Sequence, residues 1–154
     1  MQAEADGFTP GEWRREVEGA CARHGLALTP LRQSVLAIVS ESPAPLGAYA
    51  IIEALSRREG KSIAPPTVYR TLDFFLEHGF LHKIESRNAY ARCAHFDHEH
   101  ESAQLICEKC GRSEEVEDSG LAAALDAAAA RLQFRPKRRM IEVIGLCRDC
   151  AEAA

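Results

Sequence analysis

Two Cys-x-x-Cys pairs constrain this chain more than any other feature of its sequence. Cys107 and Cys110 form one pair, and Cys147 and Cys150 form the other. Each pair presents two thiolates from one tight turn, so both pairs together supply the tetrahedral sulfur shell that suits zinc. A shell of four sulfurs leaves no open coordination position. The sequence therefore predicts a structural zinc that contributes to the folding free energy of a small domain.

The competing interpretation is that these cysteines are redox-active or incidental. No apolar run approaches the ~20 residues needed to cross a bilayer. The N-terminal stretch MQAEADGFTPGEW lacks the basic-then-apolar layout of a secretory signal. We therefore expect a cytoplasmic protein with no membrane partner. In a reducing compartment, paired cysteines are more often metal ligands than disulfides.

The first part of the chain carries the signals of a winged helix-turn-helix. Thr-Pro steps at 9–10 and 29–30 provide an N-cap followed by proline at the first helical position. Apolar spacing predicts helices over residues 10–23, from 30 to a break at 42–45, over 48–57 and over 65–78. Two alternating runs, 80–84 and 89–93, then form a hairpin. The helix over 65–78 is placed to enter a major groove.

The second part of the chain predicts a small α/β domain. Residues 103–107, 112–117 and 140–146 have strand patterns, and the Ala-rich segment 120–132 favours helix. The predicted fold class is α+β, with a winged-helix domain over 1–92, a second domain over 93–154 and a hinge at about 86–100. The net charge is −4, so a DNA-binding surface would be a local patch on the first domain.

Five residues of the first domain are candidates for DNA contact. Arg70, on the groove-facing helix, can donate to guanine O6 and N7 together and is the candidate base reader. The candidates for phosphate contact are Arg32, Tyr49, Thr67 and Tyr69. The competing interpretation for each is a surface or half-buried structural role.

A second group of metal-ligand residues remains after the four-sulfur site is filled. Its members, together with several carboxylates, are His82, Cys93, His95, His98 and His100. A single thiolate among imidazoles favours zinc over iron. The competing interpretation is a solvated polar linker. A metal site assembled from two domains would couple metal binding to their relative orientation, which is the physical basis of a sensor.

Several motifs together resemble the ferric uptake regulator (Fur) family over roughly residues 10–150. The segments that carry the resemblance are LTPLR at 28–32, PTVYRTL at 66–72, GFL at 79–81, the His-rich stretch and the two Cys-x-x-Cys pairs. Within the family, the chain looks most like the zinc uptake regulator branch. That likeness lies in PPTVYR at 65–70 with LDF at 72–74, GFLHKIES at 79–86, and a cysteine at 93 shortly before Phe96-Asp97.

The resemblance implies a homodimeric, metal-dependent transcriptional repressor whose second domain dimerises. In the zinc branch, the ligands of the sensing zinc would fall here on His82, Cys93, His100 and Glu115. His95 and His98 are alternatives to His100, because the loop is short and rich in histidine. No histidine follows position 100, so the additional metal site of iron- and peroxide-sensing members is expected to be missing.

The function expected from these features is zinc-responsive repression of zinc-uptake genes. A dimer carrying two Zn²⁺ per chain, one structural and one regulatory, would bind a palindromic operator in double-stranded DNA. One alternative is an iron- or peroxide-responsive regulator of the same family. A zinc-dependent hydrolase is the other, but neither H-x-E with P-C-x-x-C nor H-E-x-x-H is present, so no enzymatic activity is expected.

Overall fold

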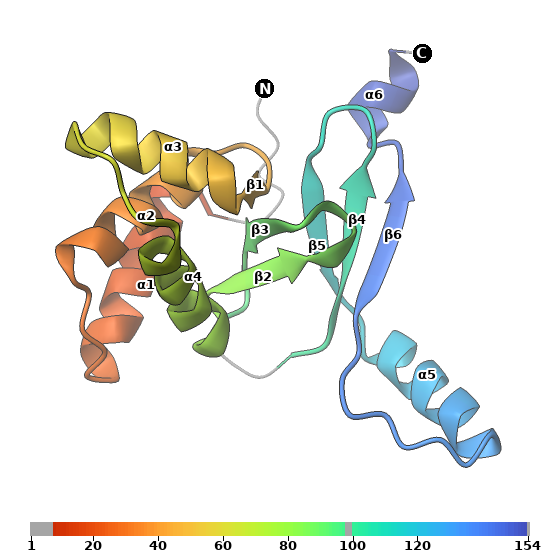
Figure 1. Ribbon diagram of the computed structural model, residues 1–154. Coiled ribbons are helices and arrows are strands. Elements are labelled where there is room, and N and C mark those ends of the chain that lie inside the picture. Colours follow the sequence, from red (N-terminus) through yellow and green to blue (C-terminus); the bar gives the residue numbers. More distant parts are fainter. Residues whose placement is uncertain (1–7, 98–99, 154) are drawn as a thin grey trace. The chain divides into compact units, whose positions relative to one another are not determined.

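The chain divides into two compact units, which we call the N-terminal unit (residues 1–97) and the C-terminal unit (residues 98–154). The computed structural model describes residues 8–97 and 100–153 of them (Figure 1). None of the helices in these described ranges is long and apolar enough to span a membrane.

Four helices build most of the N-terminal unit, and all four are predicted from the sequence. Thr9 caps the first, because its hydroxyl accepts from the Glu12 amide at 3.3 Å while the Glu12 carboxylate accepts from the Thr9 amide at 2.8 Å. The Thr29 hydroxyl caps the second by accepting from the Arg32 amide at 3.3 Å. The helices are α1 (Pro10–Arg23), α2 (Pro30–Glu41), α3 (Ala48–Glu59) and α4 (Pro65–Glu77).

A three-stranded antiparallel sheet completes the winged helix. The predicted hairpin is confirmed as β2 (Leu81–Ile84) and β3 (Ala89–Arg92), joined through Asn88 in the left-handed region at a φ of 46°. A short strand that the sequence does not predict, β1 (Leu46–Gly47), pairs with the other edge of β3. Two residues are too few to show an alternating pattern, so this strand is visible only in the fold.

The core of the N-terminal unit joins its helices to its sheet. Val68, Leu72 and Phe75 of α4 are fully buried and pack in one cluster with Trp13 of α1 and Phe80 at the start of the wing. The helix predicted to enter DNA is therefore held by the same apolar cluster that holds the hairpin.

The C-terminal unit contains a second three-stranded sheet and two helices. Its elements are β4 (Ser102–Cys107), β5 (Ser113–Glu117), α5 (Ser119–Arg131), β6 (Ile141–Gly145) and α6 (Arg148–Glu152). β4 pairs antiparallel with β5 and parallel with β6, and α5 makes the crossover between β5 and β6. Within this unit, α5 and α6 lie at opposite ends of the sheet (Figure 1). The predicted strands and the predicted helix are confirmed, while the five-residue α6 is not predicted.

Candidate functional site

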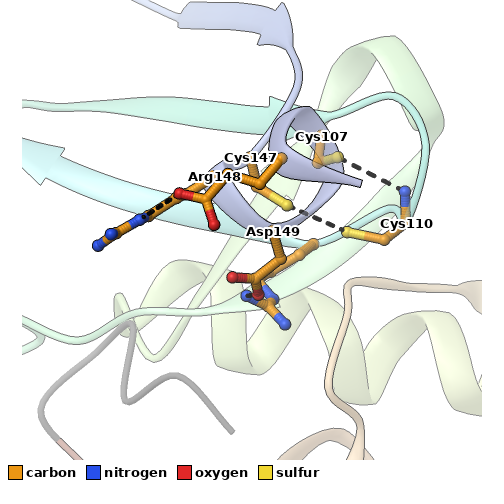
Figure 2. A network of polar contacts seen from close by, with 7 residues as sticks. Cys107, Cys110, Cys147, Arg148 and Asp149 are labelled. Atoms are coloured by element: carbon orange, nitrogen blue, oxygen red, sulfur yellow. Dashed lines mark hydrogen bonds and ion pairs between the residues drawn. The ribbon is translucent and has the colours of Figure 1, made fainter. Parts of the chain in front are cut away.

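The four paired cysteines converge at one end of the C-terminal sheet. Parallel pairing sets Cys107, the last residue of β4, opposite Gly145 at the end of β6. The turn to Cys110 and the start of α6 at Cys147 therefore lie side by side (Figure 2). All four sulfur atoms, including that of Cys150, lie within 4.8 Å of one another.

The sulfur geometry fits zinc. The sulfur atoms of Cys110 and Cys147 are 3.8 Å apart. Tetrahedral zinc with Zn–S bonds of about 2.3 Å places its sulfur ligands about 3.8 Å from one another. The four cysteines can therefore form a closed shell, which is the arrangement of a structural site rather than of a catalytic one.

Hydrogen bonds within this cluster shift the pKa values of two of its thiols in opposite directions. The Cys110 amide donates to the Cys107 sulfur at 3.5 Å, and this bond is the largest of the contributions that lower the pKa of Cys107 to about 6. In contrast, hydrogen bonding with the Cys147 side chain is the largest contribution raising the pKa of Cys150 to about 12. A divalent cation at the centre would favour the thiolate form of all four cysteines.

The N-terminal unit brings together His82 and Cys93. His82 lies on β2 opposite Ala91 of β3. The Cys93 amide donates to the Phe80 carbonyl at 3.0 Å and so continues the ladder by one more residue pair. This register places the two side chains on the same face of the hairpin, and a ring nitrogen of His82 lies within 4.8 Å of the Cys93 sulfur. Cys93 is fully buried.

The C-terminal unit brings together His100 and Glu115. The Nε2 atom of His100 lies 2.6 Å from the Oε1 atom of Glu115 on β5. Their side chains are only 7% and 2% exposed, respectively. An imidazole and a carboxylate that converge in a buried place are the nitrogen and oxygen donors that half of a tetrahedral zinc shell would need. His95 is half-buried in the N-terminal unit, whereas His98 lies outside the described residues.

The candidate DNA contacts are distributed over three helices of the N-terminal unit. Arg70 and Tyr69 of α4 and Tyr49 of α3 are exposed, and Thr67 is half-buried in the first turn of α4. The guanidinium of Arg32 lies 3.6 Å from the centre of the Phe74 ring and donates to the Ala27 carbonyl at 2.6 Å. The structure thus shows what holds Arg32, and contact of all five residues with DNA remains a prediction.

One polar residue of α4 is buried. The Thr71 side chain is shielded from solvent, and its hydroxyl donates to the Thr67 carbonyl at 3.1 Å. The physical reason is its position three residues after Val68 and four before Phe75, which places it on the apolar side of the helix. Thr71 is therefore unavailable for a DNA contact from this face.

Sequence reasoning also missed two charged residues beside the cysteine cluster. Arg112 donates to Asp149 at 3.2 Å, which joins the turn after Cys110 to the turn that contains Cys147. The available signal in the sequence was a basic residue just after one cysteine pair and an acidic residue inside the other pair. Their contact could not be predicted, because the distance between them depends on how the two turns meet.

The comparisons with known proteins agree on one family. The ferric uptake regulator family model matches residues 23–144. The chain is 39% identical to the zinc uptake regulation protein of Escherichia coli over 145 residues, which cover 94% of this chain and 84% of that protein. It is 32% identical to the ferric uptake regulation protein of Legionella pneumophila over 132 residues, which cover 82% and 92%.

A solved structure extends the likeness to three dimensions. A zinc uptake regulator complexed with zinc and DNA matches this chain with a TM-score of 0.86 and 39% sequence identity, over 95% of this chain and 97% of that one. This likeness supports the fold class predicted from the sequence, a winged helix-turn-helix followed by a small α/β domain. The family match and the near-complete coverage lead to the conclusion that this chain belongs to the ferric uptake regulator family.

Proposed function

We propose that this chain is a zinc-responsive transcriptional repressor. As a zinc-loaded homodimer it binds a palindromic operator in double-stranded DNA and controls zinc-uptake genes, and it acts in the cytoplasm, where that DNA is found. Each chain holds two Zn²⁺, one in the cluster Cys107, Cys110, Cys147 and Cys150 and one in a regulatory site. Membership of a family of regulators supports a non-catalytic role, and the closed four-sulfur shell offers no position for a substrate at the structural site.

The observation that carries the proposal is that each unit, taken by itself, holds a pair of zinc-type ligands. The N-terminal unit supplies His82 and Cys93, and the C-terminal unit supplies His100 and Glu115. Two nitrogens, one sulfur and one oxygen suit tetrahedral zinc, and the thiolate disfavours iron. The relatives with 39% identity and near-complete coverage, named as zinc uptake regulators, support the same metal.

Sharing one ion between the two pairs would restrict the orientation of the winged helix. In a dimer, the two copies of α4 must reach major grooves about 34 Å apart. If each N-terminal unit could rotate freely, the two copies of α4 would have that spacing only part of the time. A preference of a few kcal/mol for the joined arrangement would raise operator affinity by about a hundredfold.

The homodimer is supported by the apolar surface of the C-terminal unit. Leu105 of β4 and Val143 of β6 are direct cross-strand neighbours, yet they are 40% and 52% exposed. Leu132 and Phe134, after α5, are also exposed. Large apolar side chains gathered on one unit mark a surface that another chain covers. A second copy of this unit would bury the same residues on both sides of a two-fold axis.

The experiment that tests the proposal first selects DNA from a random duplex pool with the zinc-loaded protein. We expect the selected sequences to be inverted repeats. Fluorescence anisotropy then measures affinity for one selected duplex with Zn²⁺, with anaerobic Fe²⁺ and with a chelator. Zinc should strengthen binding by about a hundredfold. The Cys93→Ser variant should lose this response while it keeps its structural zinc.

Two outcomes would contradict the proposal. Equal zinc dependence in Cys93→Ser would remove the regulatory site from this position. Stronger activation by Fe²⁺ than by Zn²⁺ would favour an iron-responsive regulator of the same family. The 32% identity to a ferric uptake regulation protein is the observation that supports this alternative.

A further inference from the structure

We propose that Trp13 is a positioning residue for the regulatory zinc. Its indole N–H would hold the backbone of Cys93 so that the thiolate is presented to the metal in one orientation. This inference rests on the proposed role of Cys93 as a zinc ligand, and it assigns a function to α1, a helix that carries no ligand of either metal site.

The contact is a buried hydrogen bond between residues far apart in the sequence. The Nε1 atom of Trp13 donates to the Cys93 carbonyl oxygen at 2.8 Å, and both residues are fully buried. The Cys93 amide donates in turn to the Phe80 carbonyl at 3.0 Å. Both backbone polar groups of Cys93 are therefore held, so the position from which its thiol projects is fixed.

A tryptophan at position 13 points to a role for its N–H group, because packing alone does not require this residue. Phenylalanine or leucine would fill an apolar position of α1 without a polar atom, whereas a buried indole N–H is costly unless it finds an acceptor. Here the acceptor is the carbonyl of Cys93, the residue that follows β3. The Arg92 guanidinium lies 5.9 Å from the centre of the Trp13 ring, which is within the range of a cation–π contact.

The anchors of Cys93 belong to the cluster that holds the DNA-reading helix. Trp13 and Phe80 pack in one core with Val68, Leu72 and Phe75 of α4. A force applied at the thiol would therefore act on a closely packed body rather than on a flexible loop. Rigid attachment of a ligand also improves metal affinity, because less freedom is lost when the metal binds.

The test compares Trp13→Phe with a matched control. Trp13→Phe keeps an aromatic ring in the core and removes the N–H donor. Val17→Ala, on the same helix and equally buried, removes packing without removing a hydrogen bond. Regulatory zinc affinity is measured by competition with a chelating dye on full-length protein that retains its structural zinc, and thermal unfolding is recorded for each variant.

We expect Trp13→Phe to weaken regulatory zinc binding by about 10- to 100-fold, the usual effect of losing a residue that orients a metal ligand. Val17→Ala should lower the thermal midpoint without changing zinc affinity. Equal weakening in both variants would mean that Trp13 acts only through the stability of the unit, which would overturn the inference.

A second readout uses the parent protein, in which Trp13 is unaltered. Trp13 is the only tryptophan in the chain, so the emission of the unaltered protein reports on the surroundings of Cys93. Filling the regulatory site with Zn²⁺ should change this emission, and the same addition to Cys93→Ser should not. Unchanged emission of the parent at zinc saturation would contradict the inference.

Different results contradict the positioning role of Trp13 and the proposed regulatory site. If Cys93→Ser loses regulatory zinc while Trp13→Phe binds it like the parent, the positioning role is wrong and the proposed function stands. If Cys93→Ser binds the second zinc like the parent, the proposed regulatory site is wrong, and the role of Trp13 is wrong with it.

Discussion

The guanidinium of Arg112 lies 3.2 Å from a carboxylate oxygen of Asp149, and this ion pair joins the two cysteine turns of the C-terminal unit. Arg112 follows Cys110 by two residues, and Asp149 lies between Cys147 and Cys150. Hydrogen bonding to Asp149 raises the pKa of Arg112 further above its ordinary value, and an arginine guanidinium is charged in any case. Four thiolates around Zn²⁺ leave a surplus of negative charge, which a nearby cation offsets in part.

Replacing Arg112 by alanine should accelerate the loss of structural zinc without unfolding the protein. The Asp149 side chain is 68% exposed and that of Arg112 is 29% exposed. An ion pair of this kind contributes at most about 1 kcal/mol, so zinc release to excess chelator should be faster by no more than about fivefold. Arg148→Ala is the control, because Arg148 pairs with Glu152 within α6 and does not join the two turns. An equal acceleration in both variants would contradict this role of the ion pair.

Replacing Cys147 by serine should remove the structural zinc and unfold the C-terminal unit. Zinc bound by a closed cysteine shell contributes about 10–16 kcal/mol in small zinc domains, which exceeds the stability of most domains. Elemental analysis should show loss of this zinc, and limited proteolysis should cut the chain after residue 100. The emission of Trp13 should stay that of a buried indole, because its core lies in the N-terminal unit. A variant that keeps a protease-resistant C-terminal unit would contradict the assignment.

Replacing Cys93 by serine should lower the zinc content from two ions per chain to one. Serine removes the soft sulfur donor and leaves His82, His100 and Glu115 with three harder ligands. The matched control is Cys21→Ala, since Cys21 is the other buried cysteine outside the paired set. That variant should keep both ions, and circular dichroism should show the same helix content in both proteins. Loss of zinc from Cys21→Ala alone would place the second site elsewhere.

Local chemistry explains which parts of the fold could be predicted. Thr9 and Thr29, each followed by proline, identify helix starts because the cap and the ring act within a few residues. The Cys-x-x-Cys spacing identifies a sulfur site for the same reason. How deeply Thr71 is buried depends on how closely α4 packs against the core, and a strand of two residues such as β1 has no local signal.

Long-range contacts explain what the sequence could not predict. Trp13 and Cys93 are 80 positions apart, and no pattern of spacing connects an indole on the first helix with a carbonyl beyond the wing. The ligand-type residues were predicted from their chemistry and from the family resemblance. Their assignment to one regulatory zinc stays a proposal until metal content is measured.

Variants of Arg70 should show whether this residue recognises a base or contributes only its positive charge to DNA binding. Arg70→Ala should weaken binding to the selected operator by about 1–3 kcal/mol and weaken binding to unrelated DNA much less, because a bidentate contact to guanine distinguishes sequences. Arg70→Lys is the matched control, since lysine keeps the charge but lacks the planar pair of donors. If lysine restores full operator affinity, Arg70 contacts only phosphate. Anisotropy with both duplexes at two salt concentrations measures this difference.

Replacing Val143 by glutamate should convert the dimer into a monomer that is still folded. Val143 is 52% exposed beside Leu105 on the C-terminal sheet, so a single chain tolerates the carboxylate in water. In a symmetric dimer, the same substitution brings two buried charges to one interface, and each costs several kcal/mol. Light scattering should show half the parent mass, with both zinc ions retained. The control Lys61→Glu, on an exposed loop of the N-terminal unit, should leave the dimer intact. Operator affinity should fall with dimerisation, because one α4 then occupies only one major groove. A Val143→Glu protein that keeps the parent mass would show that the two copies meet through a different surface.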